Sequence, residues 1–184
     1  NLESDDIKTR LNQGISFTYR VRIPEGNTKY EDMIYGPIEV DNKEIDDFIV
    51  IRSDGSPTYN FTAVIDDHYM DISHVIRGED HVSNTPKQII LYEALGFTIP
   101  IFAHLPMILG SDGKRLSKRH GAPGVQTFRD EGYLPDSLNN YLALLGWNPG
   151  TEDELFSFDE LVQKFDLSKV QKKGAVWDEK KLHW

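Results

Sequence analysis

The chain has 184 residues, of which 39% are hydrophobic, and this is enough to bury a core in one or two small domains. Its formal net charge of −10 argues against a general nucleic-acid coat, since phosphate binding relies on clustered Lys and Arg. The sequence has no cysteine for disulfides or thiolate metal sites and no apolar run near the roughly 20 residues that span a bilayer, so we expect a cytoplasmic protein outside membranes.

The first 55 residues predict a small β-rich region. Apolar and polar residues alternate over residues 17–23, a period that suits a half-buried strand, and residues 47–52 suit a more buried strand. The turn-forming residues 53–57 end this region. We therefore expect a domain boundary near residue 55.

Residues 56–122 predict a βαβ-like unit. Residues 59–67 suit a strand, or a strand leading into a helix, and residues 73–77 suit a short core strand. A helix should follow, with Ser83 or Asn84 as its cap, Pro86 in its first turn and Gly96 at its end. The apolar residues 101–109 complete the unit.

Residues 123–184 predict mainly helices. Helical patterns occur at residues 127–130, 136–145 and 158–165, and turn-forming residues separate them. The chain is therefore expected to be a mixed α/β protein with consecutive domains at residues 1–55, 56–122 and 123–184.

A basic loop stands out in this acidic chain. Residues 110–121 begin and end with glycine and place Lys114, Arg115, Lys118 and Arg119 around Ser117. Such donors can surround a triphosphate and stabilise the charge that grows on a departing pyrophosphate. By composition alone, a solvated basic turn would be the commoner explanation.

This loop resembles the signature loop of class I aminoacyl-tRNA synthetases. Residues 115–119 read Arg-Leu-Ser-Lys-Arg and are similar to the Lys-Leu-Ser-Lys-Arg variant of the glutamyl branch, with Arg115 in place of its first lysine. From about Ile15 to the end, the chain resembles the bacterial glutamyl family. The similar stretches follow the order of that family, at residues 56–61, 64–68, 72–81, 84–88, 104–106 and 140–147.

The resemblance implies an α/β fold built from three parts. These are a β-rich remnant of the acceptor-stem insertion, the second half of a class I Rossmann-like catalytic domain and a helical stem-contact segment. It also implies an internal fragment, because the first class I signature, His-x-Gly-His, and an anticodon-binding region are not in the sequence. The implied reaction is activation of L-glutamate by ATP and transfer to the 3′ end of tRNA(Glu). ATP would come with Mg²⁺ as a substrate, and no structural metal is expected.

The same resemblance implies roles for individual residues. Lys118, with Ser117 and Arg115, would act in catalysis. Arg77 would pair with the side-chain carboxylate of glutamate, and Tyr59 would line the glutamate site. The other implied contacts are Asp67 near the terminal adenosine of tRNA, His81 and Asp80 near ATP and substrate, and Met107 and Ile108 around adenine through their backbone groups.

The residues themselves leave simpler interpretations open. Tyr59 could be an ordinary core tyrosine, and His81 a surface or capping histidine. Arg77 could serve in an ion pair with one of four nearby acids, Asp66, Asp67, Glu79 or Asp80. A metal site among residues 66–81 is disfavoured, because adjacent acids on a strand face opposite sides and no ligand motif occurs.

Two other functions compete with the ligase. One is a noncatalytic RNA-binding fragment, and the other is a truncated relative that glutamylates queuosine in tRNA. That relative ends soon after the signature loop, so the family-like residues 154–184 favour the ligase. We expect the parent protein to be a monomer and the fragment to self-associate through an exposed sheet edge or apolar face. Whether the parent also charges glutamine tRNA depends largely on an anticodon region that this sequence does not contain.

Overall fold

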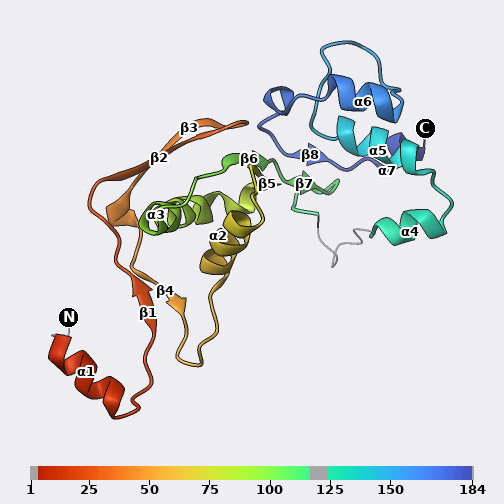
Figure 1. Cartoon of the computed structure of the whole chain (residues 1–184). Helices are drawn as coiled ribbons and strands as arrows, with labels where there is room; N and C mark the ends of the chain where they lie inside the picture. Colours follow the sequence, from red (N-terminus) through yellow and green to blue (C-terminus); the bar gives the residue numbers. More distant parts are fainter. Residues whose placement is uncertain (1–3, 117–123, 184) are drawn as a thin grey trace. The chain divides into compact units, whose positions relative to one another are not determined.

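The computed structural model of the chain describes residues 4–116 and 124–183 (Figure 1). The chain falls into two compact units that alternate along the sequence. Unit 1 comprises residues 1–30, 39–73 and 83–100, and unit 2 comprises residues 31–38, 74–82 and 101–184. These units are not consecutive segments, and the division at residues 55 and 122 stays a prediction.

Unit 1 contains an antiparallel pair of short strands. β1 (Tyr19–Val21) pairs with β4 (Phe48–Ile51). These two strands confirm the predictions made for residues 17–23 and 47–52. A helix before them, α1 (Ser4–Asn12), was not predicted from the sequence.

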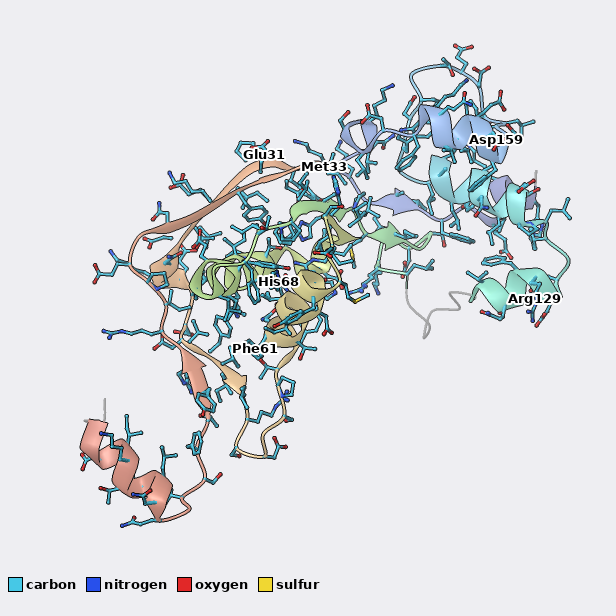
Figure 2. All side chains as sticks on the ribbon, in the orientation of Figure 1. Glu31, Met33, Phe61, His68, Arg129 and Asp159 are labelled. Carbon is cyan, nitrogen blue, oxygen red and sulfur yellow. The ribbon has the colours of Figure 1, made fainter. Side chains whose placement is uncertain are left out.

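The next element of unit 1 is α2 (Tyr59–Tyr69). The strand predicted within residues 59–67 is wrong, because α2 runs through the whole segment. Val64 is fully buried on this helix, and such packing outweighs the weak strand preference of β-branched residues. Near the end of α2, the His68 ring stacks on Phe97 with centroids 3.6 Å apart, and Figure 2 labels His68 on the helix.

The third helix described in unit 1, α3 (Thr85–Leu95), packs against α2. It confirms the predicted helix, with Pro86 in its first turn. Gly96 follows in the left-handed region at a φ of 68°, where its amide donates to the Glu93 carbonyl at 3.1 Å. A residue without a side chain is favoured at this position, as the sequence predicts.

A four-stranded sheet has the strand order β3-β2-β6-β5. β5 and β6 run parallel, in a register from His74 opposite Ile101 to Gly78 opposite Leu105. Because α3 lies between them in the sequence, they form the expected βαβ-like unit. β6 also runs parallel to β2, where Asp32 lies opposite Phe102. The strands are β2 (Asn27–Asp32), β3 (Gly36–Asp41), β5 (His74–Gly78) and β6 (Ile101–Leu105).

The rest of unit 2 is mainly helical, as predicted for residues 123–184. Two short parallel strands accompany the helices, β7 (Ile108–Leu109) and β8 (Ala175–Val176). The α-helices are α4 (Val125–Asp130), α5 (Pro135–Leu144), α6 (Phe158–Lys164) and α7 (Glu179–His183). Among the described residues, 3-10 turns occur at η1 (Asn42–Glu44), η2 (Glu79–Asn84) and η4 (Leu167–Lys169). Within residues 4–116 and 124–183, no helix is long and apolar enough to cross a membrane.

Two apolar clusters stabilise unit 2. The first joins the sheet to the helical region and contains Ile34, Ala103, Trp147, Phe156, Leu161 and Val170. The second joins α4, α5 and α7 and contains Phe128, Leu138, Tyr141 and Leu182. The first cluster includes Ala103, the neighbour of His104 on β6, so the packed core holds the strand that carries the candidate site.

Candidate active site

The candidate site of unit 2 lies at the carboxyl ends of two parallel strands. Arg77 comes one residue before the end of β5, and its register partner on β6 is His104. Ligands of open α/β sheets bind outside the carboxyl ends of the strands. The arginine that is predicted to bind glutamate therefore lies near the strand ends where proteins with open α/β sheets bind their ligands.

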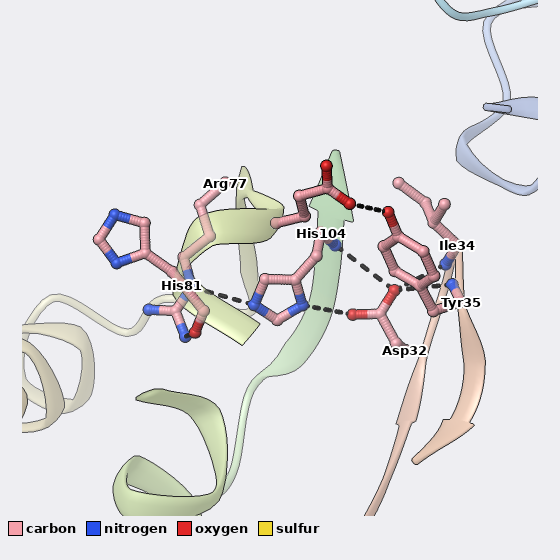
Figure 3. Close-up of polar contacts among 7 residues, drawn as sticks. Asp32, Ile34, Tyr35, Arg77, His81 and His104 are labelled. Carbon is pink, nitrogen blue, oxygen red and sulfur yellow. Dashed lines mark hydrogen bonds and ion pairs between the residues drawn. The ribbon is translucent and has the colours of Figure 1, made fainter. Parts of the chain in front are cut away.

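A chain of hydrogen bonds joins three side chains from three neighbouring strands (Figure 3). The Nδ1 atom of His104 lies 2.5 Å from Oδ2 of Asp32, and the Nε–H of Arg77 donates to Nε2 of His104 at 3.2 Å. Asp32 also accepts, through Oδ1, the backbone N–H groups of Ile34 at 3.0 Å and Tyr35 at 2.9 Å. The imidazole thus stands between the buried carboxylate and the guanidinium.

These bonds determine the protonation state of His104. The Nε of Arg77 always carries a hydrogen, so Nε2 of His104 must be an unprotonated acceptor. The single ring proton then resides on Nδ1 and is donated to Asp32. An imidazolium would point two N–H groups at each other across the contact with Arg77. The geometry therefore defines a neutral imidazole beside an ionised carboxylate.

The electrostatics of the pair agree with this assignment. Burial lowers the pKa of His104 below its ordinary value, although the Asp32 carboxylate opposes the shift. Burial acts to raise the pKa of Asp32, but hydrogen bonds from Tyr35, His104 and Ile34 outweigh it and lower that pKa. The side chains of both residues are 0% exposed. Solvent therefore does not compete for the bond between them.

A second network surrounds Glu79, which follows β5. The Tyr35 hydroxyl donates to Oε2 of Glu79, and the Met107 backbone N–H donates to Oε1 at 3.0 Å. Burial and the Glu79 carboxylate raise the pKa of Tyr35 to about 12, so its hydroxyl stays protonated as a donor. Glu79 thereby ties the end of β5 to the segment after β6.

The backbone predicted to hold adenine is already engaged within unit 2. Besides the Met107 N–H, the Met107 carbonyl accepts from the Ala175 amide at 3.1 Å, and the Ile108 carbonyl accepts from the Leu116 amide at 2.8 Å. A Cβ on Gly174 would lie 3.0 Å from the Met107 carbonyl oxygen, which explains glycine beside this segment. Each carbonyl oxygen has two lone pairs, so an additional donor can still bind there.

The base of the predicted signature loop contacts η2, which directly follows β5. Nη2 of Arg115 pairs with Oδ2 of Asp80 at 2.8 Å, and these side chains are 60% and 32% exposed. Such a solvent-accessible ion pair contributes little to stability, so its partners can be exchanged for a ligand. Ser117 and Lys118, the other predicted catalytic residues, lie outside the described residues.

The remaining predicted site residues are divided between the two units. His81 belongs to unit 2, and its carbonyl oxygen lies 3.5 Å from Nη2 of Arg77. Tyr59 and Asp67 belong to unit 1, on α2, where Asp67 accepts the Tyr92 hydroxyl at 3.0 Å. The side chain of Tyr59 is not buried in unit 1, because the residue is 53% exposed. The interpretation of Tyr59 as a core tyrosine is therefore wrong.

Sequence reasoning missed Asp32 and His104 as site residues. Two signals were present. His104 is a polar residue inside the apolar residues 101–109, and Asp32 precedes a glycine-containing turn whose amides its side chain accepts. Of the four acids considered as partners of Arg77, three have the contacts described above, Asp67, Glu79 and Asp80. The ion pair of Arg77 with one of the four stays a prediction. In the described part of the chain, no group of three or more His, Asp or Glu side chains could hold a metal ion.

Known proteins identify the family of the chain. The chain belongs to the family described as tRNA synthetases class I (E and Q), catalytic domain, which matches residues 1–184. The mixed α/β fold is that of a class I synthetase catalytic domain. Among individual proteins, the chain is 60% identical to a glutamate–tRNA ligase of Trichlorobacter lovleyi and 55% identical to that of Aquifex aeolicus. These matches cover 90% and 94% of this chain but only 35% and 37% of the relatives.

A solved structure is also similar. The glutamate tRNA ligase from Elizabethkingia meningosepticum, described as a complex with its amino acid, matches with a TM-score of 0.90 and 37% identity. The match covers 100% of this chain and 40% of that one. The chain therefore spans a little over a third of the length of its relatives.

Proposed function

We propose that this chain is part of a glutamate–tRNA ligase that activates glutamate with ATP and transfers it to the 3′ end of tRNA(Glu). The observation that carries the proposal is the guanidinium of Arg77 at the carboxyl end of β5, held by His104. High identity to glutamate–tRNA ligases supports the choice of reaction. Similarity over 100% of the chain, residues 154–184 included, favours the ligase over the shorter queuosine-modifying relative.

Arg77 is proposed to select glutamate by its side-chain carboxylate. A guanidinium carries five N–H groups in a planar fork, and the bonds to His104 and to the His81 carbonyl each use one of them. A fork of this kind binds a carboxylate through two parallel hydrogen bonds. Tyr59, which is 53% exposed, is proposed to line the amino-acid site, as the resemblance implies.

ATP, carried with Mg²⁺ as a substrate, is proposed to bind near Asp80 and the basic loop. The exposed pair of Asp80 and Arg115 can open, so that Arg115 exchanges a carboxylate for a phosphate. Met107 and Ile108 would contact adenine through their carbonyl oxygens in addition to the bonds described above. Catalysis would then rest on positioning and on charge stabilisation of the leaving pyrophosphate.

The proposed parts of the parent enzyme follow from this assignment. Residues 1–55 would be a remnant of the acceptor-stem insertion, residues 56–122 the second half of the Rossmann-like domain, and residues 123–184 a stem-contact segment. The parallel β5 and β6, with α3 between them in sequence, support the second of these. Asp67 is proposed to lie near the terminal adenosine of tRNA, and His81 near the substrate.

The function is tested in the complete protein that contains this chain. With tRNA present, it should catalyse glutamate-dependent exchange between ATP and pyrophosphate, and it should charge tRNA with labelled glutamate. Glutamine and aspartate serve as matched controls, since one has no charge and the other is one methylene shorter. An equal exchange rate with glutamine would refute a site that selects its substrate by the side-chain carboxylate.

Lys118 tests the proposed catalytic loop. Replacing it with alanine should slow adenylate formation at least about tenfold, or roughly 1.4 kcal/mol, because a donor to the departing pyrophosphate is lost. Lys114→Ala removes the same charge four residues earlier and outside the signature, so it should have a smaller effect. If the two variants have equal exchange rates, the loop acts only through its overall charge.

A further inference from the structure

We infer that Asp32 and His104 are positioning residues that orient the guanidinium of Arg77 for the side-chain carboxylate of the amino-acid substrate. The inference rests on the proposed function, because it deepens the role of Arg77 in that site. It concerns two residues whose side chains are fully buried beneath the site, and neither of them would touch the substrate.

The anchor of this arrangement is the Asp32 carboxylate. Its Oδ1 atom accepts the amides of Ile34 and Tyr35 in the turn after β2, and it lies 3.4 Å from the His104 amide on β6. Oδ2 is left to bind the imidazole at 2.5 Å. A carboxylate held by the backbone of the turn after β2 and of β6 cannot rotate freely, and it therefore fixes the imidazole that it binds.

The fixed imidazole in turn restricts the conformation of the Arg77 side chain. An arginine side chain has many rotamers, and ordering them costs free energy when a ligand binds. The bond from Nε to His104 fixes one edge of the guanidinium, and the Phe102 ring lies 5.6 Å from its central carbon. The rings of Phe102 and His104 are nearly parallel, with 8° between their planes. The fork is thus oriented before a ligand arrives.

The interposed imidazole also preserves the charge of the arginine. If Asp32 bound Arg77 directly, a bidentate ion pair would occupy the fork and neutralise it. A neutral His104 instead uses a single N–H of the guanidinium and places an uncharged ring between the two charges. The arrangement therefore orients Arg77 without adding the negative charge of Asp32 to the guanidinium directly.

Two substitutions of His104 separate its two hydrogen bonds. The amide of asparagine is two bonds from Cβ, like Nδ1, so His104→Asn retains a donor to Asp32 and loses the acceptor for Arg77. The amide of glutamine is three bonds from Cβ, like Nε2, so His104→Gln retains an acceptor for Arg77. The inference predicts a higher KM for glutamate in His104→Asn, by about tenfold to a hundredfold, with the KM for ATP unchanged.

In the same exchange assay of the complete enzyme, His104→Gln should have a smaller effect on the KM for glutamate. Both variants remove ring packing, so a purely structural histidine would give equal effects in the two. Equal effects, or a rise in the KM for ATP to match that for glutamate, would overturn the inference. Wild-type enzyme without glutamate-dependent exchange would instead refute the proposed function, so the two failures are distinguishable.

Asp32→Asn and the tautomer of His104 provide tests that do not depend on the His104 variants. The amide that Asp32→Asn introduces would place N–H groups toward Nδ1, favouring the other tautomer, in which Nε2–H opposes Arg77. The KM for glutamate should then rise as in His104→Asn.

In the wild-type enzyme labelled with ¹⁵N-histidine, the NMR signal of His104 should be that of a neutral Nδ1–H ring near neutral pH. An Nε2–H ring or an imidazolium there would overturn the inference even if every variant fails to fold.

Discussion

Replacing Arg77 with alanine is expected to lower kcat/KM for glutamate activation by about a hundredfold or more, which corresponds to roughly 3 kcal/mol. The substrate carboxylate would enter the pocket without its charged partner, and His104 would lose the donor to its Nε2. The measurement is glutamate-dependent pyrophosphate exchange by the complete enzyme with tRNA present.

Two control variants make this result specific. Arg77→Lys keeps the positive charge but removes the planar fork, so its activity should lie between those of wild type and Arg77→Ala. Arg129→Ala removes an arginine whose side chain is 73% exposed and paired with its neighbour Asp130, and glutamate activation should be unchanged. Unaltered kinetics in Arg77→Ala, with an unchanged unfolding temperature, would make Arg77 a structural residue only.

The 184-residue chain by itself is expected to yield no glutamate-dependent exchange. It spans only 35–40% of the relatives cited above, and the resemblance implies that the missing part carries the histidines of the first signature. Loss of such pre-placed groups removes transition-state stabilisation that binding alone cannot replace. Robust exchange by the purified chain would contradict this assignment of the reacting groups.

The same chain is expected to self-associate. β5 stands at one end of the strand order, and Ile76 on this strand is 50% exposed. Edge strands with exposed apolar side chains pair with other chains. Light scattering should detect species larger than 21.1 kDa, and a stable monomer without exposed apolar surface would defeat the edge argument.

Local sequence signals predicted many of the individual elements. The period-two pattern of residues 17–23 predicted β1, and Pro86 with Gly96 marked the two ends of α3. These predictions succeeded because caps, turns and side-chain alternation depend on residues close together in the sequence. Residues 59–67 were the exception, since their β-branched residues suit a strand and only packing favours α2.

By itself, the sequence determined the family, through motifs distributed over most of the chain, and it determined Arg77 as the candidate for glutamate recognition. Only the tertiary structure decided what surrounds Arg77. Asp32 is 72 residues from His104, and His104 is 27 residues from Arg77. Their contact depends on the side-by-side order of β2, β6 and β5, which is set by strand pairing and burial rather than by any local pattern. A short motif cannot encode that order, and the positioning of Arg77 therefore emerged only when the strands were brought together.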